Sequence, residues 1–237
     1  MKSEAIVELG KPLQTIESET PEPKGKEVLL KITHSGVCHS DVHIHDGYFD
    51  LGGGNKLPVG QMLNLPHTMG HEIEGEVAAI GPDVTDVEIG ANVVAYPWIG
   101  CGECATCKAG DEHYCNAPRQ LGIQLPGGFA DYCIVPDSKY VLDYTGIRPG
   151  LAATYMCSGL TAFGALKKFV NITDEDHILI MGLGGVGMMG LQFARALFNC
   201  KILAADIDPN KLQAAKGAGA DEVYDTCLLY TSDAADE

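Results

Sequence analysis

The chain has 237 residues, of which 46% are apolar and 20% are charged, a composition typical of a globular protein with one large or two small domains. Its 16 Lys and Arg face 32 Asp and Glu, and a net charge of −16 argues against binding to nucleic acids or anionic membranes. No run of about 18 apolar residues is present and the N-terminus is polar. We therefore expect no membrane span and a cytoplasmic protein.

Residues 1–145 are expected to be mostly β. Short alternating or apolar runs predict the strands, and glycine and proline between them predict the turns. The expected strands span residues 27–32, 74–80, 92–96, 131–135 and 139–142. Glycine and proline punctuate residues 48–66, which we expect to form a loop.

Near residue 150 the pattern changes to strands that alternate with helices, which is typical of a parallel sheet. The expected elements are strands at 178–181, 201–206 and 222–224 and helices at 151–170, 186–198 and 210–216. The sequence therefore predicts an α/β protein with one domain over 1–149 and a second over 150–226.

Four of the nine cysteines fall within 15 residues and follow the pattern C-x2-C-x2-C-x7-C. They are Cys101, Cys104, Cys107 and Cys115. Short spacers let thiolates converge on one tetrahedral ion, and four sulfurs leave no open coordination position. The pattern predicts a structural zinc site, with reduced surface thiols or a small iron–sulfur cluster as the alternatives.

Residues 182–187 read GLGGVG and match the dinucleotide fingerprint G-x-G-x-x-G, after an apolar strand and at the start of a helix. Gly182 would form the turn, and Gly184 would let the backbone approach a pyrophosphate. Gly187 would let the helix pack on the strand. A structural glycine turn in an unrelated α/β protein is the alternative.

The helix that opens with Gly185 and Val186 would offer free backbone N–H groups to the pyrophosphate. Asp206 ends the second strand, 19 residues after Gly187. A carboxylate there accepts a hydrogen bond from a ribose 2′-hydroxyl and repels a 2′-phosphate. We therefore expect NAD rather than NADP as the cofactor.

Two polar clusters interrupt the predicted strands: residues 36–43, GVCHSDVH, and residues 69–72, MGHE. Cys, His and carboxylate side chains are zinc ligands, and a catalytic zinc needs such ligands plus one exchangeable position. A single Cys or His is more often packed or exposed than ligating, so neither cluster identifies a metal site by itself.

The sequence resembles the zinc-dependent medium-chain alcohol dehydrogenases, in particular their archaeal and bacterial branch. That family has the same motifs in the same order along the chain: the two polar clusters, the four cysteines and the glycine fingerprint. Further matching segments are YPWIGCGEC at 96–104, EHYC at 112–115, PRQLGI at 118–123 and MCSGLTA at 156–162. The resemblance covers residues 1 to about 225. It implies a mostly-β GroES-like catalytic domain over 1–149, followed by the first half of a Rossmann NAD-binding domain over 150–226.

The resemblance also implies a catalytic zinc held by Cys38, His71 and Cys157. Glu72 would be a neighbouring carboxylate that ligates the metal in some states. Asp41 would orient His71 through its other ring nitrogen.

Further roles are implied for residues around this site. Ser40 would take the hydroxyl proton of the alcohol, His43 would pass it to solvent through the cofactor ribose, and His39 would lie near the pyrophosphate. Trp98 would wall an apolar substrate pocket, with ordinary packing as the alternative. The implied cofactors are two zinc ions per chain and NAD, and the implied substrate is a small alcohol or aldehyde. The implied assembly is a homodimer or homotetramer.

The implied reaction is hydride transfer from an alcohol to NAD, which gives an aldehyde or a ketone. A polyol or threonine dehydrogenase of the same superfamily is one alternative. A non-catalytic binding protein stabilised only by the four-cysteine zinc is another, and it would hold no metal at Cys38, His71 and Cys157.

The end of the sequence departs from the family, which continues through a second half of the nucleotide domain. We therefore expect a C-terminally truncated chain that has no dehydrogenase activity of its own. Residues 227–237 resemble a translated adapter from a sequencing library, so we expect a non-native tail there. A genuine acidic tail is the alternative.

Overall fold

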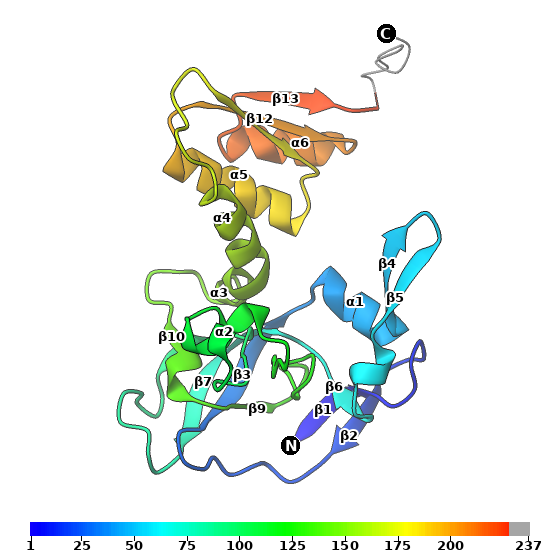
Figure 1. Ribbon diagram of the computed structural model, residues 1–237, viewed down its shortest axis with the longest axis vertical. Coiled ribbons are helices and arrows are strands. Elements are labelled where there is room, and N and C mark those ends of the chain that lie inside the picture. The colour runs from blue at the N-terminus through cyan, green and yellow to red at the C-terminus, as the bar shows by residue number, and fades with distance from the viewer. Residues whose placement is uncertain (228–237) are drawn as a thin grey trace. The chain divides into compact units, whose positions relative to one another are not determined.

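The computed structural model describes residues 1–227, which form two compact units that divide after Cys157 (Figure 1). The sequence placed the domain boundary earlier, after residue 149. Residues 150–157 belong to the first unit, where they pack against its strands. Apart from Cys227, the predicted tail lies outside the described residues. None of the helices in the described part of the chain is long and apolar enough to cross a membrane.

The first unit is mostly β, as the sequence predicts, with short helices between its strands. Its strands are β1 (Lys2–Ile6), β2 (Gln14–Glu17), β3 (Val28–Gly36), β4 (Tyr48–Gly52), β5 (Asn55–Pro58), β6 (His67–Thr68), β7 (Glu72–Ile80), β8 (Asn92–Ala95), β9 (Tyr132–Val135) and β10 (Val141–Asp143). Its helices and helical turns are α1 (His39–Asp46), η1 (Gly60–Met62), α2 (Ala105–Lys108), η2 (Glu112–Tyr114), η3 (Ser138–Tyr140), α3 (Ala152–Thr154) and η4 (Tyr155–Gly159), whose end enters the second unit.

A five-stranded antiparallel sheet with the order β10-β8-β7-β3-β9 forms the centre of this unit. A three-stranded sheet, β2-β1-β6, and the β4–β5 hairpin complete it. The most deeply buried apolar side chains of the large sheet are Val28, Leu30, Ile73, Val77, Ala95 and Val135. His71 and Glu74, at the start of β7, are polar and equally buried, so their polar atoms need partners inside the protein.

The segment 48–66, predicted as a loop, contains the β4–β5 hairpin and the turn η1. Its glycine run forms the reversal of the hairpin, since Gly52, Gly53 and Gly54 have φ values of 80°, 60° and 82°. These left-handed values suit glycine and allow the chain to reverse between the two strands. The sequence alone predicted a loop here and did not identify the strands.

The strand predicted over 139–142 begins only at Val141. The Asp137 carboxylate accepts a hydrogen bond from the Lys139 N–H at 3.1 Å, and this local bond accompanies the 3-10 turn η3. Aspartate side chains offer the backbone such an alternative to a strand ladder, which explains the difference.

The second unit is α/β, as predicted. Its elements are α4 (Leu160–Leu166), β11 (His177–Met181), α5 (Gly185–Leu197), β12 (Lys201–Asp206), α6 (Pro209–Gly217) and β13 (Glu222–Asp225). The strands pair in parallel in the order β11-β12-β13, with α5 and α6 as the connections. Leu191, Ala194, Ile202 and Ala204 are fully buried between the sheet and the helices.

The long helix predicted over 151–170 is interrupted. The wider π-helical turn η4 replaces regular α-helix at residues 155–159, and α4 ends at Leu166. Single π-helical turns within helices occur frequently at functional sites. Here the turn carries Cys157, one of the candidate metal ligands.

Candidate functional site

Three candidate metal ligands come together in the first unit although they are far apart in the sequence. The donor atoms of Cys38, His71 and Cys157 all lie within 4.8 Å of one another. The Sγ atoms of Cys38 and Cys157 are 3.8 Å apart, and Nε2 of His71 is 3.3 Å from Sγ of Cys157. Zn–S and Zn–N bonds of about 2.3 and 2.1 Å separate tetrahedral donors by about 3.6–3.8 Å. The donor types and their spacing therefore fit one zinc ion.

Asp41, in the first turn of α1, contacts two of these ligands, Cys38 and His71. Cys38 precedes the helix, and its N–H donates to Oδ2 of Asp41 at 2.8 Å. Oδ1 of Asp41 lies 3.2 Å from Nδ1 of His71 and accepts from the Gly70 N–H at 3.4 Å. Since Asp41 engages Nδ1, the other ring nitrogen of His71 faces Cys157. This is the orienting contact that the resemblance implied for Asp41.

The electrostatics of the cluster favour a thiolate beside an imidazolium. Hydrogen bonds from Cys157 and His71 lower the pKa of Cys38 to about 3. Burial lowers the pKa of His71, but the contacts with Asp41 and Cys38 outweigh it and raise the value to about 9. The hydrogen bond with Cys38, together with burial, raises the pKa of Cys157. Zinc binds thiolates and the neutral imidazole, so metal binding here would release protons from His71 and Cys157.

Glu72 lies beside the cluster but is not one of its converging donors. At this site the described donors that lie within 4.8 Å of one another are those of Cys38, His71 and Cys157, without Glu72. Glu72 is 4% exposed as a residue, and a Cβ added at Gly36 would lie only 2.0 Å from its Oε2 atom. Glycine at position 36 is therefore needed to admit this carboxylate.

The predicted proton-transfer residues share α1. Ser40 and His43 are half-buried there, and His39 is exposed. The rings of His39 and His43, one helical turn apart, have centroids 4.7 Å from each other. Phe49 of β4 contacts His43 at a centroid distance of 4.8 Å, an aromatic neighbour that the sequence analysis did not identify.

Trp98 contacts the cluster in two ways. Its ring centroid is 5.7 Å from that of His71, and its Nε1–H donates to the carbonyl of Met156 at 2.8 Å. Met156 directly precedes Cys157. The indole therefore touches one candidate ligand and holds the backbone next to another, a contact that the predicted role in a substrate pocket did not include.

The four cysteines of the predicted structural site form a second cluster. Sγ–Sγ distances are 3.9 Å for Cys101–Cys107, 3.5 Å for Cys104–Cys107 and 3.9 Å for Cys104–Cys115. These values bracket the roughly 3.8 Å edge of a tetrahedral zinc–thiolate site. A Cβ at Gly100 would lie 2.5 Å from Sγ of Cys107, so this glycine is needed for the sulfurs to converge.

Backbone N–H groups point at the sulfurs of this cluster. The N–H of Cys104 donates to Cys101, that of Cys107 donates to Cys104, and those of Cys101 and Ala117 donate to Cys115, at 3.3–3.4 Å. Backbone donors from Glu103 and Cys104 lower the pKa of Cys101 to about 6. The thiolate form is thus stabilised at Cys101, whereas burial raises the pKa of Cys107 to about 12.

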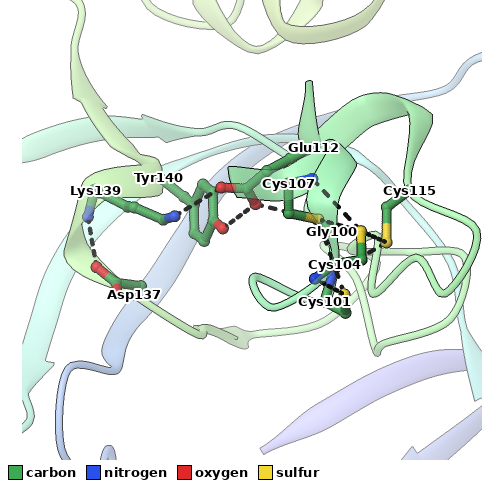
Figure 2. A network of polar contacts seen from close by, with 9 residues as sticks. All are labelled: Gly100, Cys101, Cys104, Cys107, Glu112, Cys115, Asp137, Lys139 and Tyr140. Carbon is green, nitrogen blue, oxygen red and sulfur yellow. Dashed lines mark hydrogen bonds and ion pairs between the residues drawn. The ribbon is translucent and has the colours of Figure 1, made fainter. Parts of the chain in front are cut away.

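Glu112 anchors the cysteine loop to the rest of the first unit (Figure 2). Its Oε2 accepts from the Gly100 N–H at 3.2 Å and from the Tyr140 hydroxyl, and its Oε1 accepts from Nζ of Lys139 at 2.7 Å. Burial alone would raise the pKa of Glu112, but these donors lower it overall. Sequence patterns alone do not indicate this role for Glu112.

Replacing Glu112 by glutamine is expected to lower the free energy of unfolding by about 1–2 kcal/mol at neutral pH, the scale of charge-assisted hydrogen bonds. The difference from the unsubstituted chain should shrink in acid, because a carboxyl group with a lowered pKa stabilises the fold only while it is ionised. Denaturant titrations of both proteins at several pH values measure this. Asp111→Asn is the matched control, since the Asp111 side chain makes no cap hydrogen bond. Equal effects of the two substitutions would contradict the anchoring role.

The glycine fingerprint lies in the second unit between β11 and α5. Gly182 has a φ of 82°, and a Cβ at Gly187 would lie 1.8 Å from the Gly182 carbonyl oxygen. Among the described residues, no atom beyond the adjoining residues and the backbone of the same helix lies within 4 Å of a Cβ added at Gly184 or Gly185. The protein itself therefore requires glycine at 182 and 187. At 184 and 185 glycine instead keeps the N-terminus of α5 accessible, where Val186 follows in the first turn.

Asp206 ends β12 and reaches back to the glycine loop. Its Oδ2 accepts from the Leu183 N–H at 2.6 Å, and its Oδ1 accepts from the Asp208 N–H at 2.9 Å. The bond from Leu183 is the main cause that lowers the pKa of Asp206. Asp206 and Ile207 also line a surface cavity of about 170 Å³. The carboxylate is therefore ionised at neutral pH and lies at a cavity next to the fingerprint.

The chain is similar to known alcohol dehydrogenases over nearly its whole length. The family model of the alcohol dehydrogenase GroES-like domain matches residues 24–145. An NAD-dependent alcohol dehydrogenase of Saccharolobus solfataricus is 39% identical over 230 residues, which are 96% of this chain and 65% of that protein. This chain thus spans slightly less than two thirds of that relative's length.

Solved structures of dehydrogenases have a similar fold. The alcohol dehydrogenase of Aeropyrum pernix matches with a TM-score of 0.83 and 27% identity, over 96% of this chain and 65% of the other. The D-arabinose dehydrogenase of Sulfolobus solfataricus matches with a TM-score of 0.80 and 27% identity, over 96% and 68%. The resemblance and the predicted fold class are confirmed. The chain belongs to the family of the alcohol dehydrogenase GroES-like domain, with a Rossmann-type α/β unit following that domain.

Proposed function

We propose that this chain provides the zinc and nucleotide sites of an NAD-dependent alcohol dehydrogenase, which oxidises an alcohol to an aldehyde or a ketone. The observation that carries the proposal is the convergence of two thiols and one imidazole at tetrahedral spacing, with Asp41 behind the imidazole. Three protein ligands leave the fourth position free for substrate, as catalytic zinc requires. The four-cysteine cluster would hold a second, structural zinc.

When bound, zinc would supply Lewis acidity toward the alcohol oxygen, and NAD would supply the hydride acceptor. Asp41 keeps the Nδ1 side of His71 engaged, so that Nε2 is held toward Cys157, where the zinc would bind. Ser40 would accept the hydroxyl proton, and His43, farther along α1, would pass it on. His39 would bind near the pyrophosphate, and Glu72 would stay a neighbouring carboxylate or enter the ligand set.

The nucleotide proposal depends on the second unit. The Gly184–Gly187 turn would bind the pyrophosphate with backbone N–H groups, and Asp206 would accept from the adenosine ribose. The relative named NAD-dependent supports the same cofactor.

The aromatic rings near the metal candidates favour simple alcohols over polyols. Trp98 lies next to His71, and Phe49 lies next to His43. A sugar dehydrogenase among the structural neighbours keeps the polyol alternative relevant. Homo-oligomeric assembly and a cytoplasmic location stay predictions.

Trp98 is the single tryptophan of the chain, which makes it a reporter for the proposed catalytic zinc. Adding Zn²⁺ to protein stripped by a chelator should change its emission, because its ring lies 5.7 Å from that of His71. We expect two equivalents of zinc in total. His71→Asn should remove one equivalent and the emission change, whereas Cys104→Ser should remove one equivalent and keep the change.

An emission change that survives His71→Asn would contradict the proposed site. Activity is then measured as NADH formation from primary alcohols, secondary alcohols and polyols, in a protein that contains residues 1–226 within a chain of the relatives' length. No turnover of any alcohol by zinc-loaded protein would refute the dehydrogenase assignment and favour a binding function.

A further inference from the structure

Glu74 is a fully buried carboxylate that the proposed reaction does not use. It lies on β7, three residues after His71, and its residue exposure is 0%. A buried carboxylate is costly unless hydrogen bonds replace its water. The hydrogen-bond donors around Glu74 therefore show which segments of the chain it fixes to β7.

Three groups donate to the Glu74 carboxylate or face it. The Gly150 N–H lies 3.0 Å from both oxygens, and the Tyr144 hydroxyl donates to Oε1 at 3.2 Å. Nδ1 of His34, on the neighbouring strand β3, lies 3.1 Å from the same oxygen. Two of these partners belong to the connection 144–151 between β10 and α3. Glu74 therefore ties this connection to β7.

The connection leads directly to Cys157. After Gly150 the chain enters α3, which packs against β3 and β7 with Ala152 and Ala153 each 1% exposed. The turn η4 with Cys157 follows at once. Cys157 is 86 residues from His71 in the sequence, so its approach depends on how this segment is fixed to the sheet.

We propose that Glu74 is a positioning residue for the metal site, which holds the 144–157 segment so that Cys157 meets Cys38 and His71. This inference rests on the proposed function, since it assumes that the three residues bind zinc. The hydrogen bond from Trp98 to the Met156 carbonyl is a second hold at the other end of the segment. Ligands that are fixed in advance bind metal more tightly than ligands that must be ordered on binding.

The experiment compares metal affinity at the two sites of the 237-residue chain by chelator competition, with cobalt in place of zinc to report thiolate coordination by its visible spectrum. In Glu74→Gln, an NH₂ group replaces one acceptor oxygen among donors. Affinity at the Cys38–His71–Cys157 site should fall about 10-fold or more, the scale seen when groups behind metal ligands are altered. The four-cysteine site should keep its affinity and serves as an internal reference.

Glu76→Gln, at an exposed position of the same strand, is the matched control and should change neither site. Glu74→Asp should give an intermediate loss. If Glu74→Gln does not fold, Tyr144→Phe removes one donor and should produce a smaller loss in the same direction. Unchanged affinity in Glu74→Gln, or in Tyr144→Phe where that variant is the one tested, would overturn the positioning role. An unsubstituted chain that binds metal only at the four cysteines would refute the proposed function instead.

Discussion

Replacing Cys104 by serine should lower the melting temperature of the zinc-loaded chain by roughly 10 °C. Loss of a metal site belongs to the changes that cost about 4 kcal/mol or more. For a chain of this size each kcal/mol shifts the melting temperature by about 2–4 °C. The reason is local: between residues 100 and 115 the only regular elements in the structure are α2 and η2, of four and three residues. Four thiolates that converge without a metal would repel one another.

Calorimetry and zinc analysis of the same samples measure this effect. Cys227→Ser, at an exposed cysteine outside both clusters, is the control and should change neither quantity. Removing zinc from the unsubstituted chain with a chelator should reproduce the loss of stability. A Cys104→Ser protein that keeps two zinc ions and its melting temperature would eliminate the structural site.

Most of the fold could be predicted from local patterns, and the failures have local causes. The strands β7 and β11 could be predicted because each is a short run rich in apolar residues that ends at a glycine turn. The β4–β5 hairpin was not, since a run of three glycines predicts a turn but not the strands that flank it. The break at η4 was also missed, because a change from α to π geometry leaves the apolar spacing of residues 151–170 intact.

The two metal candidates differ in how far the sequence could predict them. The four cysteines are close enough in the chain for their spacing alone to indicate convergence. Cys38 and Cys157 are 119 residues apart, so only the family resemblance paired them with His71. Spacing carries no information about ligands that the tertiary fold brings together.

Glu74 shows a further limit of sequence patterns. Glu72, Glu74 and Glu76 occupy alternate positions along β7 and therefore share one face of the strand. If that face were exposed to solvent, all three side chains would be exposed. The structure buries the first two and exposes only Glu76. The difference arises from the connection 144–151, which covers Glu74 and donates to it. The strand's own sequence does not contain this information.

The cofactor preference should depend on the charge of Asp206. We expect the chain to bind ADP-ribose roughly 100-fold more tightly than its 2′-phosphorylated analogue, because placing like charges together costs several kcal/mol. These two ligands carry the adenosine ribose that Asp206 would contact, and isothermal titration calorimetry measures both affinities. Asp206→Gly combined with Ile207→Arg should reverse the preference, since the guanidinium would bind the 2′-phosphate.

Asp206 also holds the glycine loop, so its charge must be separated from its structural contact. Asp206→Asn keeps an acceptor oxygen for the Leu183 N–H, loses the acceptor for the Asp208 N–H and removes the negative charge. This variant should bind ADP-ribose nearly as well as the unsubstituted chain and lose most of the discrimination against the 2′-phosphate. If Asp206→Asn instead weakens both ligands equally, the carboxylate acts through the loop alone. Equal affinity of the unsubstituted chain for the two ligands would show that Asp206 does not select NAD.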